Sequence, residues 1–153
     1  MNPISYTVPT PTRDELLRGR RSPYRFLLIP GAVVAAIAHI PVIGPHLREA
    51  TYMGVLFIVL TVALLALATA ALIRDSGAVY LATILTCALA IIGYAATRTV
   101  AFPQLADDVG NWLEPLGVVC VLSEALTLVA GIAALRRPLS RPPQPQLRQP
   151  PAP

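Results

Sequence analysis

Four long apolar stretches fill most of this 153-residue chain, and they constrain its fold more than any other feature. They cover residues 26–43, 51–73, 78–97 and 115–135. A helix that crosses a hydrocarbon core of about 30 Å needs about 20 residues, at about 1.5 Å per residue. Each stretch has this length or nearly so. The sequence therefore predicts an all-α integral membrane protein whose four spans form a four-helix bundle.

Charge is scarce and lies mostly at the two ends of the chain. Only 13% of the residues are charged, whereas a soluble domain typically has about 25%. All twelve basic residues are arginines, and nine of them precede residue 26 or follow residue 135. This placement is typical of the cytoplasmic flanks of membrane proteins. Because no aromatic-basic module accompanies the net charge of +4, we do not expect nucleic-acid binding.

The same pattern predicts the domain organisation and the orientation. Residues 1–25 form a basic segment that we expect to be disordered, residues 26–135 form the transmembrane domain, and residues 136–153 form a disordered Pro/Arg-rich tail. One arginine lies between the second and third spans, and two lie in the other connections. The positive-inside rule then places both termini in the cytoplasm, which predicts a multi-pass protein of the cytoplasmic membrane.

The first span has a second interpretation as a cleaved signal peptide. Residues 36–38 (AIA) resemble a small-x-small cleavage site and follow a basic region. However, that basic region is long, and apolar residues continue beyond the site. We therefore predict that the span is retained.

Glu124 is the most informative polar residue, because it lies near the middle of the fourth apolar stretch. An ionisable residue at that depth costs about 2.5 kcal/mol or more, so it usually faces other helices or a cavity. The third span carries polar residues on one helical face, among them Tyr94 and Arg98. Glu114, followed by proline, predicts the start of the fourth helix. We therefore expect an intramembrane polar cluster of Tyr94, Arg98, Glu114 and Glu124.

Three interpretations of these polar residues stay open. In the first, Glu124 pairs with Tyr94, Arg98 or His39 in a structural clasp. In the second, His39, His46 and Glu49 bind a metal or haem near the outer face, since imidazole and carboxylate groups are ligands for zinc, iron and copper. In the third, Glu124 is the centre of a small proton-coupled transporter or of a site for a lipid-like or quinone molecule.

Catalysis has no support from motifs. The sequence contains no phosphate-binding glycine loop, no HExxH and no GxSxG. The best single description is therefore a non-enzymatic accessory or interaction protein with a polar cluster near the outer face. Its partners would be the lipid bilayer and either a second copy of the chain or another membrane protein.

Three segments carry a resemblance to a known group of proteins: HIPVIGPHLREATYMGVLF, YAATRTVAFPQ and NWLEPLGVVCVLSEAL. They resemble a group of small, uncharacterised four-span membrane proteins from high-GC Gram-positive bacteria. The resemblance covers about residues 26–135. It implies the four-span architecture and a location in the cytoplasmic membrane, and it implies no functional residue.

Overall fold

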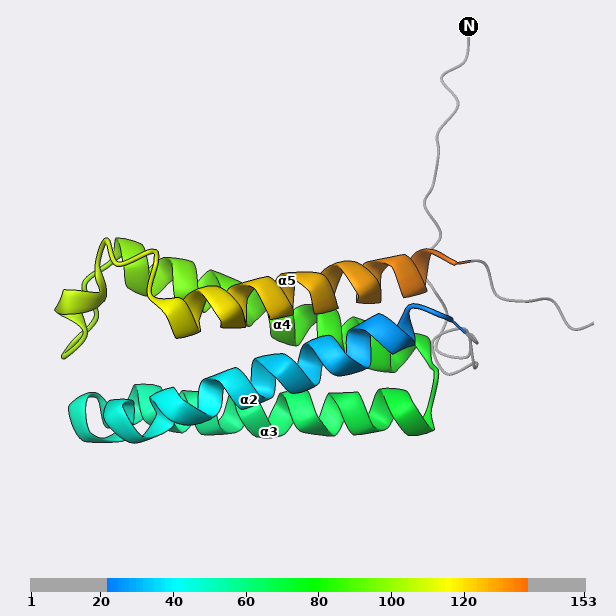
Figure 1. Cartoon of the computed structure of the whole chain (residues 1–153), viewed down its shortest axis with the longest axis horizontal. Coiled ribbons are helices and arrows are strands. Elements are labelled where there is room, and N and C mark those ends of the chain that lie inside the picture. Colours follow the sequence, from blue (N-terminus) through cyan, green and yellow to red (C-terminus); the bar gives the residue numbers. More distant parts are fainter. Residues whose placement is uncertain (1–21, 138–153) are drawn as a thin grey trace, which may run out of the picture.

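Four long helices dominate the part of the chain that the structure describes. The computed structural model describes residues 22–137. Figure 1 shows its elements in order: α2 (Arg25–Glu49), α3 (Thr51–Ile73), α4 (Gly77–Thr99), the 3₁₀ turn η1 (Ala106–Asp108) and α5 (Pro115–Arg136).

The prediction of an all-helical fold is confirmed for these residues, because each of the four long helices is long and apolar enough to cross a membrane. At about 1.5 Å per residue, a helix of 22 residues measures about 33 Å. The predicted disordered segments, 1–25 and 136–153, lie outside the described residues except for 22–25 and 136–137.

The surface of the bundle is apolar, and its interior is built mainly from small residues. Large apolar side chains such as Ile37, Val62, Leu89 and Leu122 are exposed, and they come from all four helices. Alanines form most of the buried apolar core, and serine and threonine side chains are buried among them. A soluble bundle would bury its large apolar side chains. Helices in a membrane instead pack through small residues, since lipid solvates the large ones.

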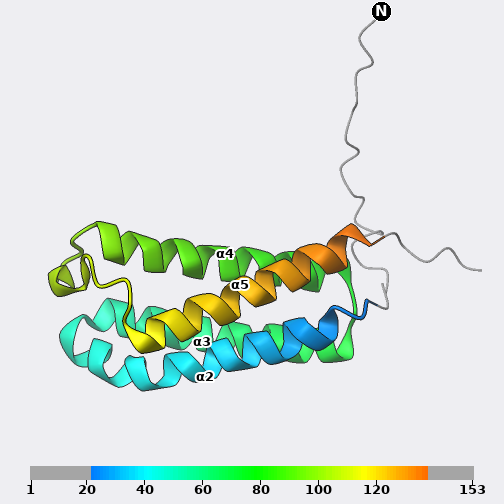
Figure 2. The same ribbon diagram turned by 45° about the horizontal axis from the view of Figure 1, so that its top comes forward.

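The helices are arranged so that α2 and α5 lie at the centre of the packing. α2 packs against α3 and α5, and α5 also packs against α4 (Figures 1 and 2). The ends of the described chain, Ser22 and Arg137, lie at one end of the bundle together with residues 74–76. We call this the terminal end. The opposite end, which we call the loop end, carries Ala50 and residues 100–114.

Helix α2 is longer than the sequence predicts. We expected its span to end near residue 43 and a loop to follow over residues 44–50, but the helix continues through Pro41 and Pro45 to Glu49. Prolines are tolerated in membrane helices, where neighbouring groups satisfy the freed backbone. The connection to α3 is then Ala50 alone. Gly54 permits this sharp corner, because a Cβ there would lie 2.6 Å from Leu47 Cγ.

The two ends of the bundle are packed differently. Near the middle, alanines of α2 meet Leu64 and Ala68 of α3 and Cys87 of α4 in one buried cluster. A second cluster, which includes Tyr80 and Leu28, fills the terminal end. From their short connection, α3 and α4 separate toward the loop end (Figure 1). Buried side chains therefore fill the terminal end, whereas a cavity lies toward the loop end.

Candidate functional site

A cavity of about 650 Å³ lies between α3 and α4 in the half of the bundle nearer the loop end. Its walls are mainly apolar side chains of these two helices: Leu56, Val59 and Leu60 on α3, and Leu89, Ala90 and Gly93 on α4. Three of these are largely exposed, with 55% exposure for Leu56, 59% for Val59 and 69% for Leu89. The cavity therefore opens sideways between α3 and α4, at a height where the helices are apolar.

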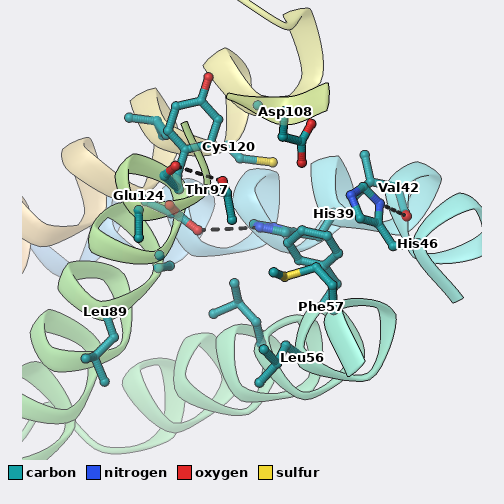
Figure 3. A pocket seen from close by; sticks show the side chains of 18 of the residues that line it. His39, Val42, His46, Leu56, Phe57, Leu89, Thr97, Asp108, Cys120 and Glu124 are labelled. Carbon is teal, nitrogen blue, oxygen red and sulfur yellow. Dashed lines mark hydrogen bonds and ion pairs between the residues drawn. The ribbon is translucent and has the colours of Figure 1, made fainter. Parts of the chain in front are cut away.

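Two buried ionisable side chains reach the cavity from the opposite side (Figure 3). His39 comes from α2 and Glu124 from α5, and both line the cavity. Glu124 is only 1% exposed and His39 only 4%. His39 Nε2 and Glu124 Oε1 are 3.7 Å apart, which is longer than a hydrogen bond. The two groups thus face each other across a gap.

The hydrogen bond at the other ring nitrogen fixes the orientation of His39. Nδ1 lies 2.7 Å from the carbonyl oxygen of Ala35. A carbonyl oxygen only accepts, so Nδ1 carries a hydrogen and donates it. The His39 ring also packs against Phe57, with 5.5 Å between ring centroids. These contacts hold Nε2 toward Glu124.

Glu124 is the less satisfied member of the pair. Within residues 22–137, its Oε1 is buried and has no hydrogen-bond partner. An unsatisfied buried polar atom costs about 1–3 kcal/mol, and more if it is charged. The other such atom in residues 22–137 is Arg98 Nε, whose side chain has an ion-pair partner. The cost at Glu124 needs an explanation, and a site for a polar group of a bound molecule would supply one.

Arg98 and Tyr94 line the cavity near the loop end and do not pair with Glu124. Arg98 forms an ion pair of 2.7 Å with Asp108 Oδ1, and its guanidinium lies over the Tyr94 ring at 4.7 Å. The Tyr94 hydroxyl donates to the carbonyl oxygen of Trp112 at 2.8 Å. Asp108 and Trp112 both belong to residues 100–114. Of the three partners considered for Glu124, the structure therefore brings only His39 into reach.

Glu114 is near the cavity, but its carboxylate serves the backbone of α5. It accepts hydrogen bonds from the amides of Leu116 and Gly117, and it caps the helix at the predicted position before Pro115. The predicted cluster of Tyr94, Arg98, Glu114 and Glu124 therefore does share one cavity lining. However, its members differ: Glu124 lies deep in the cavity, whereas Tyr94, Arg98 and Glu114 bind groups at the loop end.

The three residues of the predicted metal site are not brought together. His46 lines the cavity, but its Nδ1 lies 2.8 Å from the Val42 carbonyl oxygen. Glu49 is exposed at the last position of α2 and does not line the cavity. Nowhere in residues 22–137 do three His, Cys, Asp or Glu side chains gather as metal ligands would. The physical reason is the continuous α2 helix, which carries Glu49 past the cavity.

Two acidic residues, Asp108 and Asp75, make contacts that the sequence did not predict. Asp108 forms an ion pair with Arg98 near the loop end, and Asp75 accepts hydrogen bonds from Ser22 and Tyr80 at the terminal end. No local pattern around Asp108 predicts its ion pair with Arg98, because this pair depends on the path of an irregular loop. Asp75 lies in the predicted cytoplasmic connection between α3 and α4. The sequence did not show which groups it would bind.

Comparisons with known proteins add nothing to this geometry: no family model, curated protein or solved structure matches the chain. The resemblance to four-span proteins of high-GC Gram-positive bacteria therefore stays a prediction. Function has to be argued from the cavity and its buried pair.

Proposed function

We propose that this chain is a membrane protein that binds an amphipathic, lipid-soluble molecule in the cavity between α3 and α4. The observation that carries the proposal is a largely apolar cavity, open toward the lipid-facing surface, with one buried and unsatisfied carboxyl group inside it. A volume of about 650 Å³ is ordinary for a small-molecule site. The apolar part of the molecule would contact α3 and α4, and its polar end would reach Glu124 and His39.

Binding of a lipid-soluble molecule is one of the functions that the sequence left open. The geometry favours it over a metal site and over a proton-coupled transporter. A metal site lacks an assembled ligand set within residues 22–137. A transporter needs a path to both sides of the membrane, whereas the alanine-rich cluster around Leu64 and Cys87 closes the bundle beyond the cavity. Binding of a lipid-soluble molecule needs only the lateral opening.

The proposal is compatible with a non-enzymatic accessory role in which the bound molecule regulates contact with a second copy or another membrane protein. We place the protein in the cytoplasmic membrane with both termini inside, on the strength of the arginine distribution. Four spans put both described ends on one side, as Figure 1 also has them. The cavity would then open in the outer half of the bilayer.

The proposal can be tested by photo-crosslinking in lipid nanodiscs with a hexadecanol probe that carries a diazirine in its chain. We expect the probe to label peptides with Leu56, Val59 and Leu89 more strongly than lipid-exposed Leu72 and Ile73, located at the far end of α3. The labelled residues are identified by mass spectrometry.

Two glycines offer a matched pair of variants. Gly93 and Gly44 are both helical, and a Cβ at either position would meet nothing within 4 Å. Only Gly93 lines the cavity. We expect Gly93→Phe to reduce labelling of the cavity residues to the level of Leu72, and Gly44→Phe to leave it unchanged. Equal labelling in the wild type and both variants would overturn the proposed function.

A further inference from the structure

The two facing atoms at the depth of the cavity specify the polar end of its ligand. Nε2 of His39 and Oε1 of Glu124 are 3.7 Å apart. Neither atom makes a hydrogen bond within residues 22–137, since the His39 ring bonds through its other nitrogen, Nδ1, to the carbonyl oxygen of Ala35. An oxygen atom on the cavity side of the pair, about 2.8 Å from each of the two atoms, would bridge them. A single polar atom of a ligand can therefore contact both groups.

The protonation of the pair leaves one donor and one acceptor facing each other. A net charge without a partner at this depth is strongly unfavourable, so the pair carries one proton between Nε2 and Oε1. If His39 holds it, the imidazolium Nε2–H donates and the carboxylate accepts. If Glu124 holds it, the carboxylic acid donates and the bare Nε2 accepts. Both arrangements offer the ligand one donor and one acceptor.

From this we infer that the cavity selects a neutral lipid-soluble alcohol, whose hydroxyl oxygen bridges His39 Nε2 and Glu124 Oε1. A hydroxyl group both donates and accepts at one atom, so it satisfies the pair in either protonation arrangement. The inference rests on the proposed function and adds the chemical class of the ligand.

Other headgroups satisfy the pair less well. An ether or a carbonyl oxygen only accepts, and an ammonium group only donates, so each would leave one of the two atoms without a partner. A phosphate would place negative charge beside Glu124. Arg98 is the one arginine in the cavity lining, and Asp108 already neutralises it. The charge of the cavity therefore disfavours an anionic headgroup.

The test compares two probes that differ at one atom. The diazirine-bearing hexadecanol and its methyl ether have the same chain, but the ether lacks the hydroxyl hydrogen. In the wild type we expect the alcohol to label Leu56, Val59 and Leu89 about fivefold to thirtyfold more than the ether does, at equal probe content of the nanodisc. In Glu124→Leu this ratio is expected to fall to about one, while Gly44→Phe keeps it.

The outcomes separate this inference from the proposed function. If alcohol and ether label the cavity equally and Gly93→Phe abolishes both, the cavity binds a lipid-soluble molecule but the choice of a hydroxyl group is overturned. If labelling by neither probe depends on Gly93, the proposed function itself fails.

A measurement on the unmodified protein covers the case in which Glu124→Leu does not fold. Unlabelled hexadecanol should displace the alcohol probe from the wild type at a concentration about fivefold or more below that of unlabelled hexadecyl methyl ether. Equal displacement by the two compounds would overturn the inference without any variant.

Discussion

Two carboxyl groups with little exposure to solvent lie in the two halves of this bundle, and their surroundings are opposite. Asp75, at the terminal end, accepts hydrogen bonds from the backbone amide of Ser22 at 2.7 Å and from the Tyr80 hydroxyl. Arg25 lies 3.9 Å away as a counter-ion. Glu124, nearer the loop end, faces a cavity with an oxygen that has no hydrogen-bond partner within residues 22–137.

The difference distinguishes a carboxyl group that stabilises the fold from the one that we propose binds a ligand. Asp75 joins the start of α2, the connection after α3 and the first turns of α4, and both of its oxygens have partners. A fully satisfied buried group stabilises the fold that satisfies it. Glu124 lacks that satisfaction, so we expect it to contribute less to the stability of the folded state, and we propose that it binds a ligand. Substitutions at the two positions should therefore change the free energy of unfolding by different amounts.

The largest effect is expected from Asp75→Ala. The substitution leaves the Ser22 amide and the buried Tyr80 hydroxyl without their acceptor. Because bonds to a charged group are stronger than neutral ones, we expect the free energy of unfolding to fall by about 2 kcal/mol, measured by denaturant titration in mixed micelles. Asp107→Ala is the control, since Asp107 is exposed in η1, and it should change stability by less than about 0.5 kcal/mol.

The second effect has the opposite sign. Glu124→Leu removes a buried carboxyl group that has no hydrogen bond within residues 22–137 and replaces it with an apolar side chain. Replacing a whole buried ionic pair with apolar groups is often neutral or stabilising, and removing one partner is destabilising only when it leaves a buried charge behind. With His39 left as a neutral imidazole, Glu124→Leu leaves no such charge. We therefore expect the free energy of unfolding to stay the same or rise by about 1 kcal/mol in the same titration. A loss similar to that of Asp75→Ala would revive the structural clasp and remove the contrast between the two acids.

The sequence predicted the helices well because their signal is local. Four apolar stretches of spanning length are visible without any knowledge of their neighbours, and the Glu114-Pro115 start of α5 follows from local backbone chemistry. The end of α2 was misplaced for a related reason. Proline and glycine at 41, 44 and 45 are helix-breaking signals in water, whereas this helix continues through them.

The site was predicted only in part, because it depends on how far the helices lie from one another. The sequence predicted that Glu124 lies deep in the bundle and indicated His39 as one of three candidate partners. It did not contain the separation of α3 from α4 toward the loop end, which creates the cavity. The partners of Arg98 and Tyr94 come from the irregular path of residues 100–114. Neither feature has a periodic signature in the chain.

The smallest effect concerns the Arg98–Asp108 ion pair at the loop end of the cavity, and it shows whether the loop end is held as firmly as the terminal end. Arg98 and Asp108 lie 2.7 Å apart, but the Asp108 side chain is 25% exposed. Solvent weakens such a pair. In a double-mutant cycle of Arg98→Gln and Asp108→Asn, we expect a coupling free energy of about 0.5–1 kcal/mol, below the loss expected at Asp75. A coupling as large as that loss would mean that the loop end is held as firmly as the terminal end, and the contrast between the two ends of the bundle would be lost.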